Sequence, residues 1–427
     1  MLYDRHIKAR LLELLHDFRI VYLAGPRQAG KSTLVKEIAH EQGLAYYTLD
    51  DAALLASAQS DPHGLLASLP PPVVLDEFQQ APQLVNAIKM VSDAADGRKG
   101  LFLLTGSSDI FRSAQVQEAL PGHMARIELY PLAQTERLAV RHNAVDLLCS
   151  GVFEMTSFQA MDRKRLAEML IAGGYPEAIS KQPRSRSAWF SSYIEGRLLK
   201  DFEVMHHAKG DYHTKLYALI RNLAGMTGNL IRYANIANDL SQDDKTVKKY
   251  IEILELMFIV RLLPSYVRNR AKRAVVGMPK LHFLDTGLAC HLLGLKKPEP
   301  LYVAQFFGGL VETMVVCELL KHAAWAEEEV AFHHFRDRDK NEVDLVMEQG
   351  DGRVIGIEVK ASMSVRTEDF SGLASFAEYA GNQFQQGVLL YSGDKILPFR
   401  INNTVFHALP ISLLWTASSS AQENPGA

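Results

Sequence analysis

The stretch Gly25-Pro26-Arg27-Gln28-Ala29-Gly30-Lys31-Ser32 fits the pattern G-x-x-x-x-G-K-[ST]. It follows the apolar run at residues 20–23 and precedes a helical pattern of apolar residues at 34–38. A strand, a glycine-rich turn and a helix in this order place backbone amides around a phosphate chain, at the positive end of the helix. We therefore expect ATP, with Mg²⁺, to be bound by Gly25, Pro26, Arg27, Gln28, Ala29, Gly30, Lys31, Ser32 and Thr33. In this site Lys31 reaches the β- and γ-phosphates and Ser32 supplies a hydroxyl to the metal.

A second apolar run, at residues 73–75, ends in two carboxylates, Asp76 and Glu77. We expect Asp76 to hold Mg²⁺ through its water shell and Glu77 to orient or deprotonate the attacking water. A Glu directly after the Asp is typical of P-loop ATPases with an extra strand between the loop strand and the acidic strand. Residues 101–105 suit that strand, and its polar end, Thr105 or Ser107, would contact the γ-phosphate or the lytic water.

Four motifs resemble the AAA superfamily of ATPases: GPRQAGKST at 25–33, VVLDEFQ at 73–79, LLTGSS at 103–108 and GGYPEA at 173–178. More closely, they are similar to a large bacterial and archaeal group in which an AAA domain precedes a C-terminal domain of unknown function. The resemblance extends to about residue 410. It implies an α/β fold for the first domain, a P-loop AAA-type parallel sheet with helices on both faces.

The sequence departs from that group where the group usually carries an L-x-G-R turn. Here His123 stands at the usual arginine position, and Arg126 follows three residues later. The resemblance therefore points to Arg126 or Arg112 as a nucleotide-sensing arginine, with a solvated surface arginine as the alternative.

The composition is that of an ordinary globular protein, with 48% hydrophobic and 22% charged residues. The net charge of −3 argues against general polyanion binding, so a nucleic-acid surface would have to be a local patch. Three widely separated cysteines, each in an apolar run, are expected to be buried and reduced. No apolar run approaches the ~20 residues of a membrane span, and the N-terminus has no signal-peptide pattern. We expect a cytoplasmic protein that does not engage a membrane.

Changes in pattern along the chain predict five parts. These are an AAA-type domain at 1–138, a helical region at 139–229, a winged-helix-like region at 230–300, a restriction-endonuclease-like α/β domain at 301–415 and a disordered tail at 416–427.

The winged-helix prediction rests on a helix–turn–helix pattern followed by a basic hairpin. A first helix ends near Leu240, and a second carries a buried stripe of Val247, Tyr250, Ile251, Leu254 and Met257. Lys245, Lys248 and Lys249 lie off the stripe, and the hairpin between strands at 258–263 and 280–284 carries Arg268, Arg270, Lys272 and Arg273. These charges would suit phosphate contacts with DNA. Protein docking is the alternative use of such a region.

The C-terminal part carries acids in an order found in restriction-endonuclease-like nucleases. Glu312 lies in a helical pattern, Asp344 in a first strand, and Glu358 and Lys360 in the next. Alternation along a strand points Glu342 and Asp344 to one side, and Glu358 and Lys360 to one side. Glu312, Asp344 and Glu358 could then hold Mg²⁺, with Lys360 as the catalytic partner. The sequence leaves open whether this domain cleaves DNA.

The leading interpretation is an ATP-hydrolysing AAA-type protein that acts on DNA. The alternative is a nucleotide-dependent switch that binds proteins, for example in toxin–antitoxin control or stress signalling, with a non-catalytic C-terminal domain. The sequence also leaves open association into a homo-oligomer and the identity of any protein partner.

Overall fold

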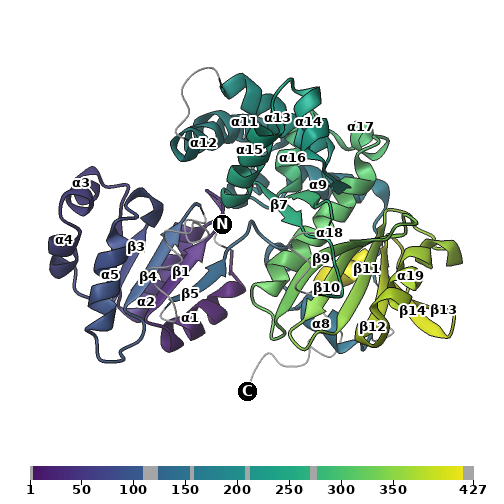
Figure 1. The fold of residues 1–427 in the computed structure, drawn as a ribbon, viewed down its shortest axis with the longest axis horizontal. Helices are drawn as coiled ribbons and strands as arrows, with labels where there is room; N and C mark the ends of the chain where they lie inside the picture. Colours follow the sequence, from purple (N-terminus) through teal and green to yellow (C-terminus); the bar gives the residue numbers. More distant parts are fainter. Residues whose placement is uncertain (1–2, 109–123, 154–157, 207–211, 270–276, 417–427) are drawn as a thin grey trace. The chain divides into compact units, whose positions relative to one another are not determined.

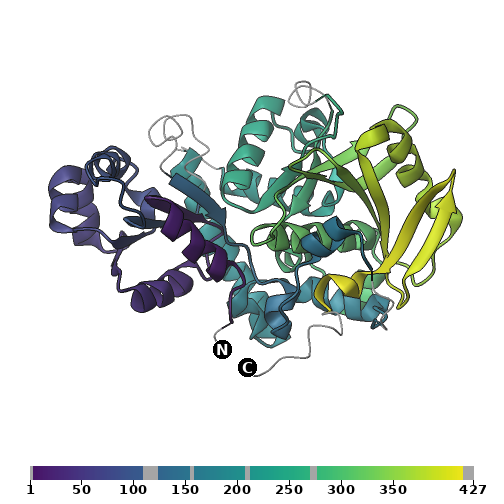
Figure 2. The same cartoon turned by 90° about the horizontal axis from the view of Figure 1, so that it is seen from below.

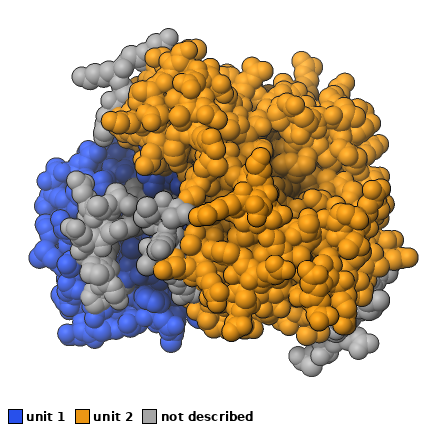
Figure 3. Space-filling view, turned by 45° about the vertical axis from the view of Figure 1, so that its right-hand side comes forward, with its two compact units in different colours: residues 1–132, 253–259 blue, residues 133–252, 260–427 orange. Residues whose placement is uncertain are grey.

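The computed structural model describes residues 3–108, 124–153, 158–206, 212–269 and 277–416. The chain divides into two compact units, Met1–Leu132 with Ile253–Ile259, and Ala133–Glu252 with Val260–Ala427 (Figure 3). The first unit is therefore built from two separate stretches of chain. In it, the ring of Phe258 meets that of Tyr130 edge to face, with 6.5 Å between centroids.

The first unit is a five-stranded parallel sheet in the order β2-β3-β4-β1-β5 (Figure 1). The three central strands are buried along their whole length, as strands covered on both faces should be. The strands are β1 (Ile20–Ala24), β2 (Ala45–Thr48), β3 (Val73–Asp76), β4 (Phe102–Gly106) and β5 (Met124–Glu128). The helices are α1 (Ile7–Asp17), α2 (Lys31–Gln42), α3 (Ala52–Ser60), α4 (Pro62–Ser68) and α5 (Leu84–Asp93).

The expectation of an extra strand is confirmed, because β4 pairs with β1 on one side and with β3 on the other. All three strands run in the same direction, so their carboxyl ends meet at one edge of the sheet. This edge carries the glycine-rich loop after β1, the two acids after β3 and the polar residues after β4. Strand β5 was not predicted as a strand.

The second unit begins with a helical region. It contains α7 (Gln134–Leu138), α8 (Ala144–Ser150), α9 (Arg163–Ala172), α10 (Pro176–Ile179), α11 (Pro183–Tyr193), a π-helical turn (Ile194–Leu198), α12 (Leu199–His206) and α13 (His213–Gly225). The predicted break at 173–176 lies between α9 and α10 and has a packing reason. A Cβ on Gly173 would lie 2.6 Å from Oδ1 of Asp285, and the backbone N–H of Gly174 donates to Oδ2 of that carboxylate at 2.6 Å. The absence of a side chain at Gly173 therefore lets the loop close on a buried carboxylate.

The next region combines helices α14 (Tyr233–Asp239) and α15 (Asp244–Leu256) with an antiparallel sheet in the order β6-β8-β7. Its strands are β6 (Asn229–Leu230), β7 (Val260–Leu263) and β8 (Lys280–Phe283). The predicted apolar stripe of the second helix is buried, as expected. The strand expected from residue 258 begins two residues later, because Phe258 has φ 60° and lies outside the β region. Arg270, Lys272 and Arg273 of the basic hairpin lie outside the described residues.

The C-terminal part is a six-stranded mixed sheet in the order β13-β14-β12-β11-β10-β9, with the β13–β14 hairpin at one edge (Figure 2). The strands are β9 (Val330–Arg336), β10 (Glu342–Gln349), β11 (Val354–Lys360), β12 (Phe384–Tyr391), β13 (Leu397–Ile401) and β14 (Thr404–Pro410). The helices before and within it are α16 (Thr286–Leu292), α17 (Pro298–Tyr302), α18 (Phe307–Ala323) and α19 (Ser371–Ala380). Leu373 and Phe376 of α19 join Val346 and Val354 of the sheet in one apolar core. Of the predicted disordered tail at 416–427, Thr416 is described and residues 417–427 lie outside the described residues.

Helix α18 is buried on nearly every side and carries four buried polar residues, Glu312, Thr313, Glu318 and His322. Glu318 accepts the backbone N–H of Gln134 at 2.8 Å and pairs with Lys321, and His322 accepts the backbone N–H of Ala144 at 2.8 Å. These bonds satisfy Glu318 and His322 within the fold, and the hydroxyl of Thr313 bonds that of Thr227 at 2.9 Å. Glu312 instead belongs to a cluster of charged residues at the C-terminal sheet. All three cysteines are free thiols and buried, as predicted.

Candidate functional site

The glycine-rich loop connects the end of β1 at Ala24 to the start of α2 at Lys31. Gly30 has φ 101°, a conformation that favours glycine, at the position before the helix. A Cβ on Gly25 would lie 2.1 Å from the carbonyl oxygen of Leu129. Both glycines of the pattern are thus required by the backbone path of the loop.

Lys31 is buried, and its Nζ donates to the carbonyl oxygens of Gly25 at 2.7 Å and Pro26 at 2.9 Å. The ammonium group therefore lies within the loop that is expected to wrap the phosphates. Arg5, which precedes α1, supports the loop from outside. Its guanidinium donates to the carbonyl oxygens of Ala29 and Tyr130, both at 2.6 Å. Arg5 was not predicted from the sequence, because it lies well before the loop in the chain and is not part of the loop motif.

Asp76, at the end of β3, is held by three side-chain hydroxyls. Thr105 donates to Oδ1, Tyr46 donates to Oδ2 at 2.6 Å, and Ser32 also bonds the carboxylate. Burial by itself would raise the pKa of Asp76, but these hydrogen bonds bring it below its usual value. The carboxylate is therefore ionised at neutral pH. Tyr46 was not predicted, and burial together with its bond to Asp76 raises its own pKa.

Ser32 and Asp76, expected from the sequence to share a metal, do lie together. A hydroxyl and an ionised carboxylate are the hard oxygen groups that Mg²⁺ prefers, directly or through water. The residues present thus fit the metal that the loop implies.

Glu77 follows Asp76 with φ 56°, a left-handed conformation that a non-glycine residue rarely adopts. Such a conformation costs of order 1–3 kcal/mol and is found mostly at functional sites. Gln79 donates to the Glu77 carboxylate and to Oγ of Ser107 at 3.0 Å, and its own Oε1 accepts the backbone N–H of Ser107 at 3.2 Å. Arg27 of the loop lies 3.6 Å from the same carboxylate. Gln79 thus ties Glu77 to the end of β4, a role that sequence reasoning missed.

The remaining predicted residues of this site are placed as follows. Thr105 and Ser107 lie at the end of β4 as expected, but within the described residues they bond Asp76 and Gln79 respectively. Thr33 is exposed on the first turn of α2. Arg126 lies on the edge strand β5 and pairs with Glu128. Arg112 and His123 lie outside the described residues.

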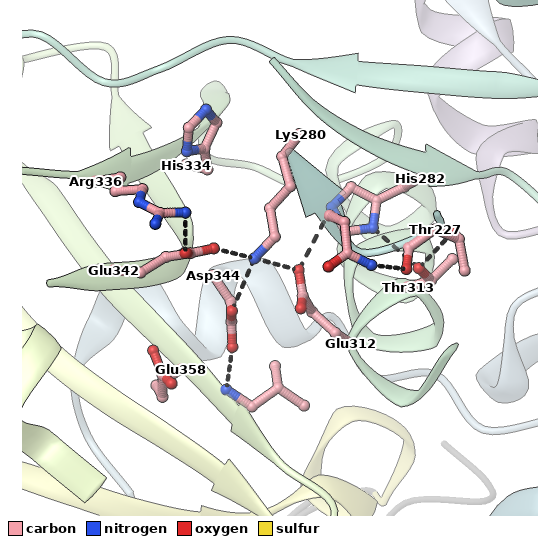
Figure 4. A network of polar contacts seen from close by, with 12 residues as sticks. Thr227, Lys280, His282, Glu312, Thr313, His334, Arg336, Glu342, Asp344 and Glu358 are labelled. Atoms are coloured by element: carbon pink, nitrogen blue, oxygen red, sulfur yellow. Dashed lines mark hydrogen bonds and ion pairs between the residues drawn. The ribbon is translucent and has the colours of Figure 1, made fainter. Parts of the chain in front are cut away.

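The acids of the C-terminal domain gather around a lysine, as Figure 4 shows. Nζ of Lys280, on β8, lies 2.7 Å from Glu312, 3.0 Å from Glu342 and 2.8 Å from Asp344. Lys280 itself is 1% exposed. The expected alternation is confirmed, since Glu342 and Asp344 face the same ammonium group. Among the described residues, no group of three or more His, Cys, Asp or Glu side chains is arranged to hold a metal ion.

The neighbouring strand completes this cluster. Leu345 of β10 pairs with Ile357 of β11, which sets Asp344 opposite Glu358, and the backbone N–H of Val359 donates to Asp344 at 2.9 Å. Lys360 pairs with Glu358 at 3.0 Å, so these two share a face as expected. Glu312, Asp344 and Glu358 are thus brought together. Lys280 is the member that sequence reasoning missed, although a lysine in a fully buried strand was the available signal.

Burial and charge act together on the ionisation of the cluster. Burial by itself would lower the pKa of Lys280, but the charges of Asp344, Glu312 and Glu342 raise it well above its usual range. Burial, with the charge of Asp344, raises the pKa of Glu312 well above its usual range. The same two causes raise the pKa of Glu358 to about 8. Lys280 is therefore a charged ammonium group at neutral pH.

Comparison with known families supports part of this assignment. Residues 17–138 match the model of an AAA domain, so the chain carries an AAA-type P-loop domain, a nucleotide-binding fold. Residues 163–299 and 307–414 match two models described as domains of unknown function, DUF8612 and DUF4143. No helix in the described part of the chain is long and apolar enough to cross a membrane.

Curated relatives include two uncharacterised proteins, from Mycobacterium bovis and Mycobacterium tuberculosis. Each is 25% identical over 419 residues, which cover 97% of this chain and 85% of the relative. Similar solved structures include a Walker-type ATPase of Pyrococcus abyssi, at 14% identity and TM-score 0.44 over 68% of this chain and 96% of that one. AMPPCP-bound DnaA from Aquifex aeolicus matches at 12% identity and TM-score 0.24, over 58% and 85%. Structural likenesses this weak carry no functional conclusion.

Proposed function

We propose that this protein binds ATP with Mg²⁺ and hydrolyses it at the carboxyl edge of the first sheet. The observation that carries the proposal is the meeting of Ser32, an ionised Asp76 and a buried Glu77 next to the glycine-rich loop. These are the groups that phosphoryl transfer to water needs, since catalysis there consists of positioning and charge stabilisation.

In this proposal each residue has one task. Backbone amides of the loop and Lys31 bind the phosphates, and Ser32 and Asp76 hold the magnesium, which when bound neutralises charge on the β- and γ-oxygens. Glu77 accepts a proton from the attacking water or orients it. Its left-handed backbone and the bond from Gln79 set the direction of its carboxylate. Thr105 or Ser107, at the end of β4, senses the γ-phosphate or the lytic water. Arg126, as the nucleotide-sensing arginine, would have to exchange its pairing with Glu128 for the nucleotide.

Two substitutions separate binding from turnover. Lys31→Ala is expected to abolish nucleotide binding, measured by titration with a fluorescent ATP analogue. Glu77→Gln is expected to keep binding but to lower hydrolysis by on the order of 10²–10⁴, the usual contribution of a general base.

Lys99→Ala, an exposed lysine of the same unit, is the matched control and should leave both quantities unchanged. Wild-type hydrolysis in the Glu77→Gln protein would contradict the role given to that carboxylate.

A second proposal is that the region at 230–300 contacts DNA in the manner of a winged helix. It is supported by three exposed lysines on α15, Lys245, Lys248 and Lys249, on the side away from its buried stripe. Such contacts would bind phosphates without reading sequence. We do not extend the proposal to DNA cleavage by the restriction-endonuclease-like domain, because the ammonium group of Lys280 lies among its acids.

The rival function is a nucleotide-dependent switch that binds proteins. The two are told apart by measuring ATP hydrolysis with and without single-stranded, duplex and branched DNA. Stimulation by any DNA form supports the DNA role, whereas slow turnover that no DNA changes supports the switch.

A further inference from the structure

A groove lies along one edge of the first sheet. Strand β2 is the edge strand there and, among the described strands, pairs only with β3. The groove has a volume of about 590 Å³ and is lined by residues of β2, of α3 and of α4. Figure 1 shows α3 and α4 on the side of the sheet away from β1 and β5. A space of this size is within the range that binding sites occupy.

The groove follows the edge of the strand and not one face of the sheet. Three consecutive residues of β2, Tyr46, Tyr47 and Thr48, line it. Successive side chains of a strand point to opposite faces, so a groove over a single face would be lined by alternate residues only. Contact with three residues in a row therefore places the groove against the backbone edge of β2.

This edge presents backbone groups that β3 does not use. The N–H groups of Ala45 and Leu49 donate to the carbonyl oxygens of residues 72 and 76, at 3.3 and 3.0 Å, and so face β3. Because backbone groups alternate in direction along a strand, Tyr46 and Thr48 turn theirs to the opposite side. The carbonyl oxygen of Thr48 accepts the N–H of Asp51 at 3.2 Å. Within the described residues, the N–H of Thr48 and both backbone groups of Tyr46 then face the edge, where another strand can pair with them.

The side chains of the groove favour a positively charged partner. Among the described residues that line it, Asp51 is the acid and none is basic. The ring of Tyr46 already attracts one ammonium group, that of Lys36, which lies 4.9 Å from the ring centroid. The half-buried ring of Tyr47 offers a second aromatic surface beside it. A lysine or arginine side chain that enters the groove therefore meets both a carboxylate and an aromatic ring.

We propose that this groove binds an extended, basic segment of a partner protein, which adds to β2 as a further strand of the first sheet. Backbone bonds to the edge supply affinity, and Asp51 selects positive charge. Leu54 and Leu65 receive the apolar side chains that alternate with the basic ones. The segment also contacts Tyr46, whose hydroxyl donates to Asp76 at 2.6 Å. The proposal goes beyond ATP hydrolysis and does not require it.

The first test measures the fluorescence anisotropy of a labelled hexapeptide of alternating arginine and valine with the full-length, nucleotide-free protein. The wild type is expected to bind this peptide and not the matching peptide of glutamate and valine. Asp51→Asn should weaken binding about three- to fivefold, as the loss of an exposed ion pair does, because asparagine still caps α3. Asp61→Asn is the matched control, since Asp61 is an exposed cap of α4 that does not line the groove. Equal affinity in the two variants overturns the proposal.

Two N-methylated versions of the basic peptide test the strand pairing. Methylation at the arginines or at the valines removes the N–H groups from one side of an extended segment only. One version should lose affinity by about tenfold or more, while the other keeps it. Equal effects of the two methylations would rule out strand addition. A protein dimer that Tyr47→Ala dissociates, with no peptide bound, would assign the groove to a second copy of this chain and would also overturn the proposal. No nucleotide is present, so these failures leave the proposal of ATP hydrolysis standing.

Discussion

Glu77 shows how a strained residue depends on its neighbours. Its left-handed backbone sets where the side chain starts, and the carboxylate is then fixed by Gln79, which also bonds both the side chain and the backbone of Ser107. A base that must hold a water molecule in line gains from such a bridge, because small misplacements of a catalytic group slow a reaction strongly.

Gln79→Ala is therefore expected to lower kcat for ATP hydrolysis about tenfold, equivalent to about 1.4 kcal/mol in the activation free energy. The KM for ATP should stay near the wild-type value, because Gln79 is a positioning residue and the phosphates are bound elsewhere. The measurement is steady-state ATPase kinetics.

Gln80→Ala is the matched control, since the amide of Gln80 turns to Asp50. If kcat were the same in the Gln79 and Gln80 variants, the bridge to Ser107 would have no part in turnover.

At the scale of elements, α15 carries exposed lysines that would suit a polyanionic partner. Its buried stripe leaves Lys248 and Lys249 exposed, and Lys248 is only weakly paired, 3.9 Å from Glu252. Asp243 and Asp244, at the N-terminal end of the helix, place negative charge beside Lys245. The exposed positive charge of α15 is therefore concentrated at Lys248 and Lys249.

Lys248→Glu/Lys249→Glu is expected to weaken DNA binding about equally for all sequences, because phosphate contacts carry no base information. The slope of log affinity against log salt should fall by about 1 for each lysine–phosphate interaction that the substitutions remove. Fluorescence anisotropy over a series of salt concentrations measures both quantities.

Arg98→Glu/Lys99→Glu changes the same number of exposed charges outside residues 230–300 and serves as the control. Equal DNA affinity and equal salt slope in the two double variants would remove α15 from the DNA surface and favour protein docking.

Helices and strands were predicted correctly where the spacing of apolar residues and the positions of the flanking glycines indicate the same element. Strands β1, β3 and β4 and the apolar stripe of α15 follow directly from such patterns. Strand β5 was missed, because this five-residue edge strand alternates apolar and charged residues and shows no continuous apolar run. In the nucleotide site and in the acid cluster of the C-terminal domain, the residues of the motifs were predictable, because phosphate and metal binding require particular residue types at fixed spacing. Arg5, Tyr46, Gln79 and Lys280 were not, because contacts between distant stretches of chain leave no local pattern.

At the scale of the whole molecule, the larger unit buries two histidines beside Lys280. Burial, with the charge of Lys280, holds the pKa of His282 well below its usual value. Burial lowers the pKa of His334 to about 4, against the hydrogen bond of its Nε2 to the carbonyl oxygen of Met278 at 2.9 Å. Both rings are neutral in the folded unit at pH 7.

His334 is therefore expected to destabilise the larger unit in acid, whereas Glu312 and Glu358, whose pKa values are raised, act in the opposite direction. Below pH about 6.5 the His334 side chain is protonated in the unfolded chain but stays neutral in the folded unit. Its contribution to the free energy of unfolding is therefore fully present above that pH and is lost as the pH falls toward 4. One such group contributes a slope of at most about 1.4 kcal/mol per pH unit. Urea unfolding followed by tryptophan fluorescence at pH 7 and pH 5, in wild type and in His334→Gln, measures this contribution as the difference between the two proteins.

His334→Gln should reduce this slope, whereas His213→Gln, at an exposed histidine of the same unit, should not. An unchanged slope in the His334 variant would mean that the ring is protonated in the folded protein as well.

Ile253–Ile259 belong to the first unit although they follow residue 132 by a long stretch of the second unit. A fragment that ends before them therefore does not contain the whole first unit. A fragment that stops at residue 132 would keep the nucleotide residues but lose Phe258, and the ring of Tyr130 would lose its edge-to-face partner. Tyr130 also presents its carbonyl oxygen to Arg5, which supports the loop. Cutting the chain after residue 132 therefore removes a ring that packs on Tyr130, whose carbonyl oxygen holds the arginine that supports the loop. Recombinant work on ATP binding should include residues 253–259 together with the first unit.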